Sequence, residues 1–355
     1  MKVIIVMLTV VNFVFCQQKD DVVRLINRSG YKGESHQVET EDGYLLTVHH
    51  IPPSGGSPKK FPVFLQHGLI VTSVDWVIAG PKRALAYYLA DAGYDVWMGN
   101  TRGSKHSMNH RNLSIDSPEF WTFSFNEMGM YDLPAMIDHV LNQTGASQTF
   151  YVGHSQGGST FLVCMSMRPE YNAKIVHAHL LAPAAFMNHV PHPAFSSLAA
   201  EIRKNFFRNY MYVDLSRIWD VGSELAKMFC VGVRTPLTTT LCEAVIFVTV
   251  GPNKKGIELD RKIVKALVPY MSPRISTNQM VHYAQLYYSG NFESFDYRWR
   301  DFSKRRRRTF KSSRPVRYAL ENISTPIYLY RGADDVVIGK TVSKVTNMKH
   351  RNGKL

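Results

Sequence analysis

The stretch Thr149-Phe-Tyr-Val-Gly-His-Ser-Gln-Gly157 decides the fold. An apolar, strand-like run leads into the pattern Gly-x-Ser-x-Gly, and a helix-like run over 157–167 follows it. This pattern is typical of a sharp strand-to-helix turn that lifts a serine Oγ to the open end of a sheet. Residues without a Cβ allow the helix and the strand to pass closely. The stretch therefore predicts a nucleophile at Ser155, with a structural turn serine as the alternative.

Short apolar runs alternate with helix-like stretches on both sides of this turn. Strands are expected over 61–66, 94–98, 149–152, 176–181 and 326–330, and helices over 83–92, 131–141 and 157–167. This alternation predicts an α/β protein, a mostly parallel sheet with helices on both faces. Residues 31–51 predict an antiparallel hairpin that flanks the sheet.

The alternation stops between about 184 and 320, which predicts an insertion. This region is rich in aromatic, Met and Pro residues, and segments such as 241–250 suit either core helices or the surface of a lid. The expected organisation is a signal peptide over 1–16, a first part of the core over 17–183, a mainly helical cap over 184–320 and a second part of the core over 321–355.

The amino terminus predicts export. Lys2 precedes an almost wholly apolar run that ends at Cys16, a pattern typical of a signal peptide cleaved before Gln17. The run is shorter than the about 20 residues that span a bilayer. We therefore expect a secreted or lysosomal protein without a stable transmembrane anchor; an uncleaved anchor is the alternative. Four sequons agree with export and predict glycosylation at Asn27, Asn112, Asn142 and Asn322.

Removal of the signal leaves an odd number of cysteines, so at most one disulfide can form within the chain. Cys230 and Cys242 are the favoured pair because they lie close in sequence in a loop-rich region, where closing the loop contributes about 3 kcal/mol. Cys164 falls on the apolar face of the helix after Ser155. It is expected to be a buried, inert thiol.

The charge of the chain is concentrated near its end. Residues 254–355 carry 22 of the 42 basic side chains and 8 of the 28 acidic ones. The centre of this excess is Lys304 followed by Arg305, Arg306, Arg307 and Arg308. The cluster suits a solvated loop, contact with an anionic lipid surface or another polyanion, or proteolytic processing. Nucleic acid is not an expected partner of an exported chain.

Acyl transfer by a serine needs a base beside its Oγ, an acid that orients the base, and N–H donors for the oxyanion. The acid should follow a late strand, and Asp334 does so, with Asp335 as the alternative. The backbone N–H groups of Gln156 and of Leu69 are the expected oxyanion donors.

Two histidines near these positions are not expected to act as the base. His67 is expected to be structural and to hold the loop before Leu69. His154, inside the turn itself, is expected to face away from the Oγ of Ser155.

Six motifs together resemble the acid lipase family of gastric, lysosomal and insect gut lipases. They are Gln66-His-Gly-Leu69, Met98-Gly-Asn-Thr-Arg-Gly103, Phe120-Trp-Thr-Phe-Ser-Phe-Asn-Glu-Met128, Tyr131-Asp-Leu-Pro-Ala135, Gly153-His-Ser-Gln-Gly157 and Tyr330-Arg-Gly-Ala-Asp334. The resemblance implies an α/β-hydrolase core with a helical cap that hydrolyses triacylglycerol or sterol esters at a lipid–water interface. The resemblance also implies that hydrolysis needs no metal or organic cofactor.

By the same resemblance, Ser155 corresponds to the family's nucleophile and Asp334 to its acid. Leu69 and Gln156 correspond to its oxyanion hole. Cys230 and Cys242 resemble the disulfide of its cap. The stretch over 298–314 is more basic than the family usually shows there.

The base is where the chain departs from the family. The family's His-Leu-Asp-like motif does not occur before Leu355. A further helix, a strand and two loops need roughly 25 residues to return from Asp334 to Ser155. Only 21 remain, and His350, a weak candidate, comes 16 residues after Asp334. We therefore expect a C-terminally truncated member: a fragment, an incomplete gene model or a degenerate relative.

The first functional hypothesis is a secreted lipase that hydrolyses lipid esters through an acyl-enzyme on Ser155. The alternative is a catalytically incomplete, lipase-like protein that binds lipid but lacks the base histidine. A third is an acyltransferase or peptidase on the same fold.

Overall fold

The computed structural model describes residues 20–188, 199–200, 212–214, 266–267, 270–272, 274–297 and 314–332. Several predictions concern residues outside these ranges: the signal peptide, the segment 241–250, the disulfide Cys230–Cys242, the arginine cluster, Asp334 and His350. The boundaries at 184 and 320 also stay predictions.

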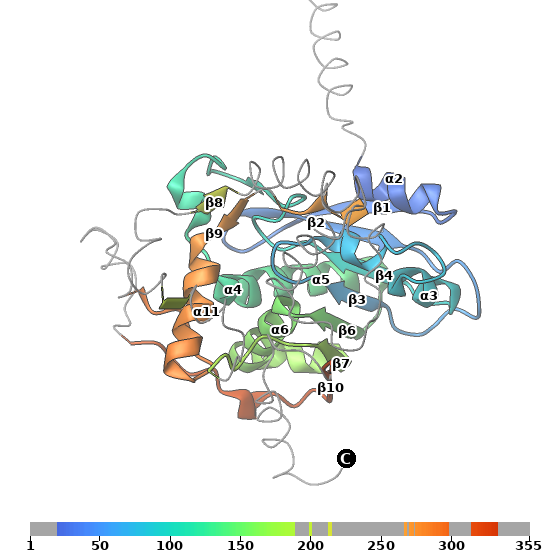
Figure 1. The fold of residues 1–355 in the computed structure, drawn as a ribbon. Helices are drawn as coiled ribbons and strands as arrows, with labels where there is room; N and C mark the ends of the chain where they lie inside the picture. The colour runs from blue at the N-terminus through green and yellow to red at the C-terminus, as the bar shows by residue number, and fades with distance from the viewer. Residues whose placement is uncertain are drawn as a thin grey trace, which may run out of the picture.

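The described chain folds into a sheet with helices packed on it (Figure 1). Its strands are β1 (Glu34–Glu39), β2 (Tyr44–Ile51), β3 (Val63–Gln66), β4 (Val96–Gly99), β5 (Asn109–His110), β6 (Thr149–His154), β7 (Ile175–Leu181), β8 (Tyr212–Asp214), β9 (Arg274–Ser276) and β10 (Ile327–Tyr330). Its helices, with short 3₁₀ and π turns marked η, are α2 (Asp21–Arg28), η1 (Ser73–Trp76), α3 (Leu85–Asp91), η2 (Pro118–Trp121), α4 (Phe125–Glu127), η3 (Met128–Asp132), α5 (Leu133–Thr144), α6 (Gln156–Met167), η4 (Pro169–Lys174), α11 (Thr277–Ser289) and η8 (Leu320–Asn322).

The main sheet has eight strands in the described part of the chain. Its order is β1-β2-β4-β3-β6-β7-β10, and β5 pairs with β2 beside this path. The strands from β4 to β10 run parallel, whereas β1 and β2 form an antiparallel hairpin at the flank. The predicted α/β class and the predicted hairpin are both confirmed. Strand β10 pairs with β7 although a long segment separates them in sequence.

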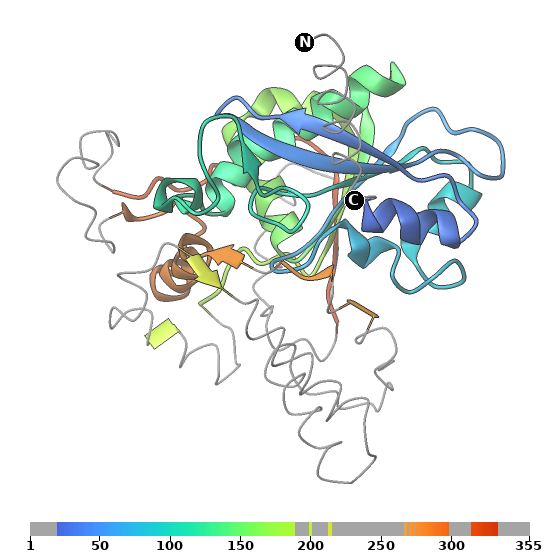
Figure 2. The same cartoon turned by 90° about the horizontal axis from the view of Figure 1, so that it is seen from above.

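Side chains alternate between the two faces of this sheet because successive residues of a strand point in opposite directions. Phe64, Trp97 and Tyr151 lie in the core between the sheet and the helices α5 and α6. Leu65 and Met98 lie in a second core, which α2 and α3 cover. Figure 2 shows the green helices α5 and α6 on one side of the sheet and the blue helix α2 on the other.

A buried ion pair joins the hairpin to the helical layer. The Arg102 guanidinium donates to Asp132 Oδ1 at 2.7 Å and to Asp42, in the hairpin turn, at 2.8 Å. Its planar group lies 3.9 Å from the ring centre of Tyr44. Removing one partner of such a buried pair costs about 3–5 kcal/mol, because the other charge stays buried and unpaired. The motifs around Arg102 and Asp132 meet here, a contact that sequence analysis did not predict.

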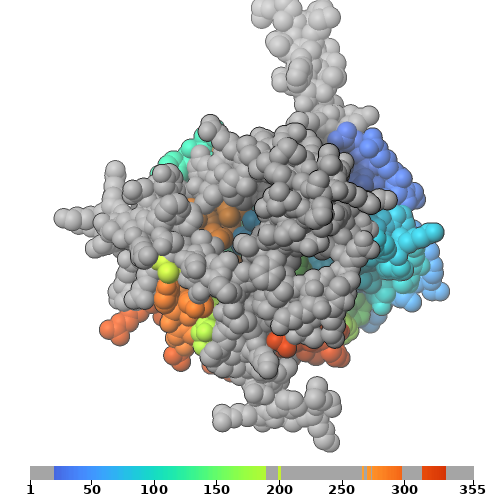
Figure 3. Space-filling model, viewed as in Figure 1, coloured from blue at the N-terminus to red at the C-terminus, as the bar shows by residue number. Residues whose placement is uncertain are grey.

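The membrane and glycosylation predictions concern the outside of the molecule. Among the described helices, none is long and apolar enough to cross a bilayer. All four sequon asparagines have exposed side chains, at Asn27, Asn112, Asn142 and Asn322. In the space-filling view of Figure 3, the blue helix α2, which carries Asn27, lies at the surface. The signal peptide and glycosylation remain predictions.

Candidate active site

Ser155 lies at the tip of the predicted turn between β6 and α6. Strand β6 ends at His154, helix α6 begins at Gln156, and the backbone of Ser155 has φ 51° and ψ −112°. A positive φ costs a residue with a Cβ about 1–2 kcal/mol. The Ser155 N–H donates to the Leu181 carbonyl at 2.8 Å, which helps to hold this conformation.

Both glycines of the motif are required by close contacts. A Cβ at Gly153 would lie 2.8 Å from the Gly157 carbonyl carbon. A Cβ at Gly157 would lie 2.5 Å from the Gln66 carbonyl oxygen, at the end of β3. Both distances are far below van der Waals contact, and in each case the neighbour is backbone that cannot rotate away. The glycines thus let β3, β6 and α6 converge at Ser155.

Backbone strain gathers at this edge of the sheet. Three residues other than glycine have positive φ in the part of the chain that the structure describes: Ile70 (62°), Ser155 (51°) and Ala182 (48°). They follow β3, β6 and β7, so all three lie beyond the carboxyl ends of parallel strands. Strained conformations persist where the surrounding structure holds them, and they cluster at functional sites. Ligands of open parallel sheets bind at this same edge.

The predicted oxyanion donors belong to two segments that adjoin Ser155. A Cβ at Gly68 would lie 3.2 Å from the Ser155 Cβ, so the loop after β3 passes directly beside the nucleophile. Leu69 is the next residue of that loop. Gln156 is the first residue of α6, and the N–H groups of a helix's first turn have no partner within the helix. The arrangement can stabilise negative charge near the Ser155 side chain.

His67 holds the oxyanion loop, as expected from the sequence. Its Nδ1–H donates to the Gly68 carbonyl at 2.7 Å, and its Nε2 accepts from the Thr101 N–H at 3.2 Å. Burial lowers the pKa of His67 to about 4, so the ring is neutral at neutral pH. With both nitrogens engaged in fixed roles, His67 is a structural residue.

His154 interacts with a carboxylate that sequence analysis missed. Its Nδ1 lies 3.5 Å from Asp75 Oδ2 in η1, and its side chain is 45% exposed. The same nitrogen would be 3.4 Å from a Cβ at Gly68. Asp75 belongs to no sequence motif. It reaches His154 only because η1 packs against the turn.

Helix α11 connects the predicted insertion to the nucleophile turn. The Gln156 side-chain amide donates to Gln279 Oε1 at 2.8 Å, and the Tyr283 hydroxyl donates to Gln156 Oε1 at 3.4 Å. All three side chains are buried. The side chain of the residue that follows Ser155 is therefore held from α11. Sequence analysis assigned neither Gln279 nor Tyr283 to the site.

The acid and the base remain predictions. Strand β10 runs parallel to β7, and β7 parallel to β6, so the chain leaves β10 at the edge where Ser155 lies. Asp334 comes four residues after Tyr330. Both Asp334 and His350 lie outside the described residues. Cys164 is free and buried in α6, and burial raises the pKa of its thiol, as expected for an inert residue.

Comparison with known proteins matches this geometry to a family. Residues 22–80 match a region described as a partial alpha/beta-hydrolase lipase region, and residues 62–217 match the alpha/beta hydrolase fold. The chain is 38% identical to Lipase 1 of Drosophila melanogaster over 89% of this chain and 68% of that protein. It is 34% identical to gastric triacylglycerol lipase of Mus musculus, over 89% and 79%. The chain belongs to the acid lipase family.

The solved structures agree with the fold of an acid lipase. An epoxide hydrolase from Vigna radiata superposes with a TM-score of 0.50 at 17% identity, covering 90% of this chain and 87% of the other. At that identity the likeness concerns the α/β-hydrolase fold alone. The family resemblance that the six motifs predicted is thus confirmed, and with it an ester hydrolase of the lipase type.

Proposed function

We propose that this acid lipase is a secreted or lysosomal enzyme that hydrolyses carboxylic esters of lipids, triacylglycerol or sterol ester, with Ser155 as nucleophile. The observation that carries the proposal is the strained Ser155 backbone at the end of β6, packed against the loop that contains Leu69. The names of the relatives, lipases of fly and mouse, support the lipid substrate. The apolar amino terminus and the four exposed sequon asparagines support the secretory route.

In the proposed mechanism the Ser155 Oγ attacks the acyl carbonyl while a base takes its proton. The tetrahedral oxyanion accepts hydrogen bonds from the N–H groups of Leu69 and Gln156. Collapse of this intermediate releases the alcohol, which receives the proton from the base, and leaves an acyl-enzyme. Water, activated by the same base, then releases the fatty acid. Asp334 orients the base.

No described histidine is assigned as this base. His67 has both ring nitrogens in hydrogen bonds to backbone, and His154 faces Asp75. His350 is therefore the histidine to test. The order along the chain, Ser155, then Asp334, then His350, is the order nucleophile, acid, histidine that α/β hydrolases have.

The decisive experiment compares hydrolysis of an emulsified triacylglycerol and of a long-chain p-nitrophenyl ester by the chain, by Ser155→Ala and by Ser166→Ala. Ser166 is the matched control, because it lies near the other end of α6 and its hydroxyl bonds only within that helix. We expect Ser155→Ala to lower kcat/KM by about 10⁴-fold or more. Ser166→Ala should keep most of the activity.

Three other results have definite meanings. A chain no faster than its Ser155→Ala variant, yet still binding lipid, supports the alternative of a catalytically incomplete, lipid-binding relative. Activity that His350→Gln abolishes, without loss of fold, assigns the base to His350. Ester formation with added alcohols in preference to hydrolysis would support the acyltransferase interpretation.

A further inference from the structure

A row of polar and aromatic side chains crosses the antiparallel flank of the sheet. Glu34 on β1 is opposite His50 on β2, and His50 is opposite Trp97 on β4. His36 lies two residues after Glu34, so it shares the same face of β1. Directly opposite residues have Cβ atoms about 4.5–5.5 Å apart. The register alone therefore brings Glu34, His36 and His50 together.

The donor atoms of these three side chains converge. Glu34 Oε2 lies 2.9 Å from His50 Nδ1 and 3.7 Å from His36 Nε2. All three atoms lie within 4.8 Å of one another. The His36 Nε2 is buried and has no hydrogen-bond partner, and a buried nitrogen without a partner calls for an explanation.

His50 is oriented from behind by a carboxylate. Its Nε2 lies 2.5 Å from Asp95 Oδ1, and Asp95 Oδ2 accepts a hydrogen bond from the Trp97 indole at 3.1 Å. The Trp97 ring also stacks on His50 with centroids 4.0 Å apart. A metal-binding histidine almost always donates its other N–H to a carboxylate, a carbonyl or water, which sets its tautomer and its direction. Asp95 holds His50 in this way, with Nδ1 directed at Glu34.

We propose that Glu34, His36 and His50 bind a zinc ion. A tetrahedral zinc ion with bonds of about 2.0–2.2 Å holds its donor atoms about 3.3–3.6 Å apart. The two separations from Glu34 Oε2, 2.9 and 3.7 Å, bracket this range, and all three donor atoms lie within 4.8 Å of one another, so the side chains need only close around the ion. Two imidazoles and one carboxylate form a known zinc ligand set with a fourth position left for water.

Metal binding requires neutral imidazole and ionised carboxylate. His50 Nδ1 lies at hydrogen-bond distance from Glu34 Oε2 in the metal-free chain, so zinc must displace the proton between these two atoms. One nearby charge opposes the ion, since the Lys32 ammonium lies 2.6 Å from Glu34 Oε1.

A third histidine borders the site from the helical layer. The ring of His139, on α5, lies 5.3 Å from that of His36, and its Nε2 is likewise buried without a hydrogen-bond partner. The Glu34 and His36 side chains are 32% and 22% exposed, whereas the His36 Nε2 atom itself is buried.

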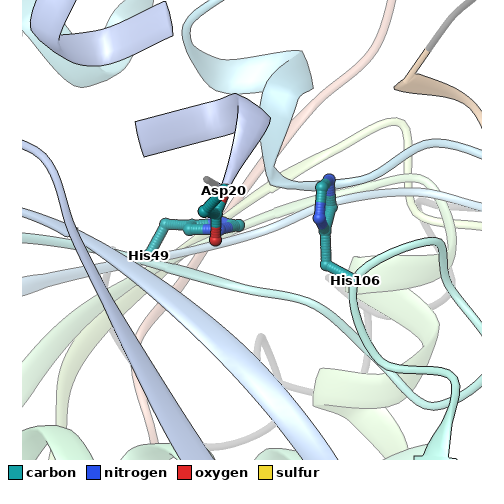
Figure 4. A group of neighbouring side chains, drawn as sticks. All are labelled: Asp20, His49 and His106. Carbon is teal, nitrogen blue, oxygen red and sulfur yellow. The ribbon is translucent and has the colours of Figure 1, made fainter. Parts of the chain in front are cut away.

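A second histidine cluster on the opposite face of β2 is a weaker match. Asp20, His49 and His106 also bring their donor atoms within 4.8 Å (Figure 4). However, Asp20 Oδ1 caps α2 by accepting from two backbone N–H groups, and its Oδ2 accepts from His49. The other nitrogen of His49 faces Ser73 Oγ at 2.6 Å and the Asn100 amide at 3.2 Å, so no carboxylate or carbonyl orients it.

The proposed zinc site is independent of the proposed lipase activity. Strand β1 lies four strand spacings from β6, which places the site roughly 19 Å across the sheet from Ser155. Zinc there would link the edge strand β1 to β2. The expected consequence of binding is a more stable flank, and not a change in chemistry at Ser155.

The test is titration of the metal-free full chain with ZnCl₂ by calorimetry, with melting measured in parallel. We expect one zinc ion per chain and a rise in Tm of about 4 °C at a hundredfold excess over Kd. His36→Gln and His50→Gln should each weaken binding about tenfold or more, and Asp95→Asn by about 10–100-fold. His106→Gln is the matched control from the second cluster and should leave zinc affinity unchanged.

Zinc binding that survives both His36→Gln and His50→Gln, or that His106→Gln removes, would overturn the proposal. A wild-type chain that takes up no zinc would also overturn it. In that case a protonated His50 donates hydrogen bonds to both Glu34 and Asp95. If the variants do not fold, X-ray absorption of the zinc-loaded wild-type chain decides. Two imidazole nitrogens and a carboxylate oxygen around zinc support the site, and any other set of ligands contradicts it.

Discussion

Two regions of the main sheet are held in place by different kinds of interaction. At the carboxyl ends of the parallel strands, Ser155 is held by backbone: a Cβ at Gly157 or Gly153 would lie 2.5 or 2.8 Å from backbone atoms, and the Ser155 N–H donates to the Leu181 carbonyl. At the antiparallel flank, His50 is held by side chains, between the carboxylates of Glu34 and Asp95. The turn tolerates no added atom, whereas the flank depends on charge and is partly open to solvent.

The stability of the two regions should therefore depend on different variables. The nucleophile turn should respond steeply to added volume, and to pH through the buried His67 of the neighbouring loop. The histidine row should respond to protons and metals and only weakly to the loss of a single side chain. The predictions that follow test this contrast.

The largest effect is expected from Gly157→Ala. The new Cβ would lie 2.5 Å from the Gln66 carbonyl oxygen, and backbone on both sides prevents relief by a change of rotamer. We expect a loss of more than about 3 kcal/mol in the free energy of unfolding, or no folded protein. Urea unfolding followed by circular dichroism measures it. The control is Gly30→Ala, where φ is +89° but no atom lies within 4 Å, and where about 1–2 kcal/mol is expected. Equal losses would show that crowding does not set the turn.

The second effect is a pH dependence that arises at the oxyanion loop. The pKa of His67 is about 4 in the folded chain, below its usual 6.5. The unfolded chain therefore binds more protons between these values, and the contribution of His67 is present above pH 6.5 and lost as pH falls to 4. That contribution is about 3 kcal/mol. Urea unfolding at pH 7 and pH 4 should show a smaller acid loss in His67→Gln than in wild type. His110→Gln, near the surface on β5, is the control and should leave the acid loss unchanged.

The smallest effect is expected at the flank, from Glu34→Gln in zinc-free buffer. The Glu34 side chain is 32% exposed, and partly exposed ion pairs contribute less than about 1 kcal/mol. Because the folded pKa of Glu34 is about 2 and its usual value 4.5, its contribution is present above pH 4.5 and lost as pH falls toward 2. The difference in unfolding free energy between variant and wild type should thus shrink below pH 4.5. A loss at pH 7 as large as that of Gly157→Ala would erase the contrast between the two regions.

Much of the core was predictable because its causes are local. The strands β3, β4, β6, β7 and β10 and the helices α3, α5 and α6 all lie where apolar runs and alternation indicated them. Helix α2 and the π turn η3 were not predicted. Helix α2 follows directly after the stretch that was interpreted as a leader, and η3 is a local widening of a helix that periodicity describes as continuous.

The site was predictable in part. Ser155, Gln156 and Leu69 belong to short motifs, so sequence analysis could place them beside one another. Asp75 and Gln279 belong to none, and each reaches the turn only because a distant segment packs against it. Contacts between segments 79 and 123 residues apart leave no periodic signal in a single chain.

The nucleophile turn, the α/β alternation and the family follow from the sequence, because short motifs and apolar periodicity act within a few residues of one another. Only the tertiary structure decided that Glu34, His36 and His50 meet, since a shift of one residue in the pairing of β1 with β2 would move these side chains to opposite faces. Only the tertiary structure likewise brought α11 to Gln156. Strand register and helix packing come from the whole core, and no local stretch encodes them.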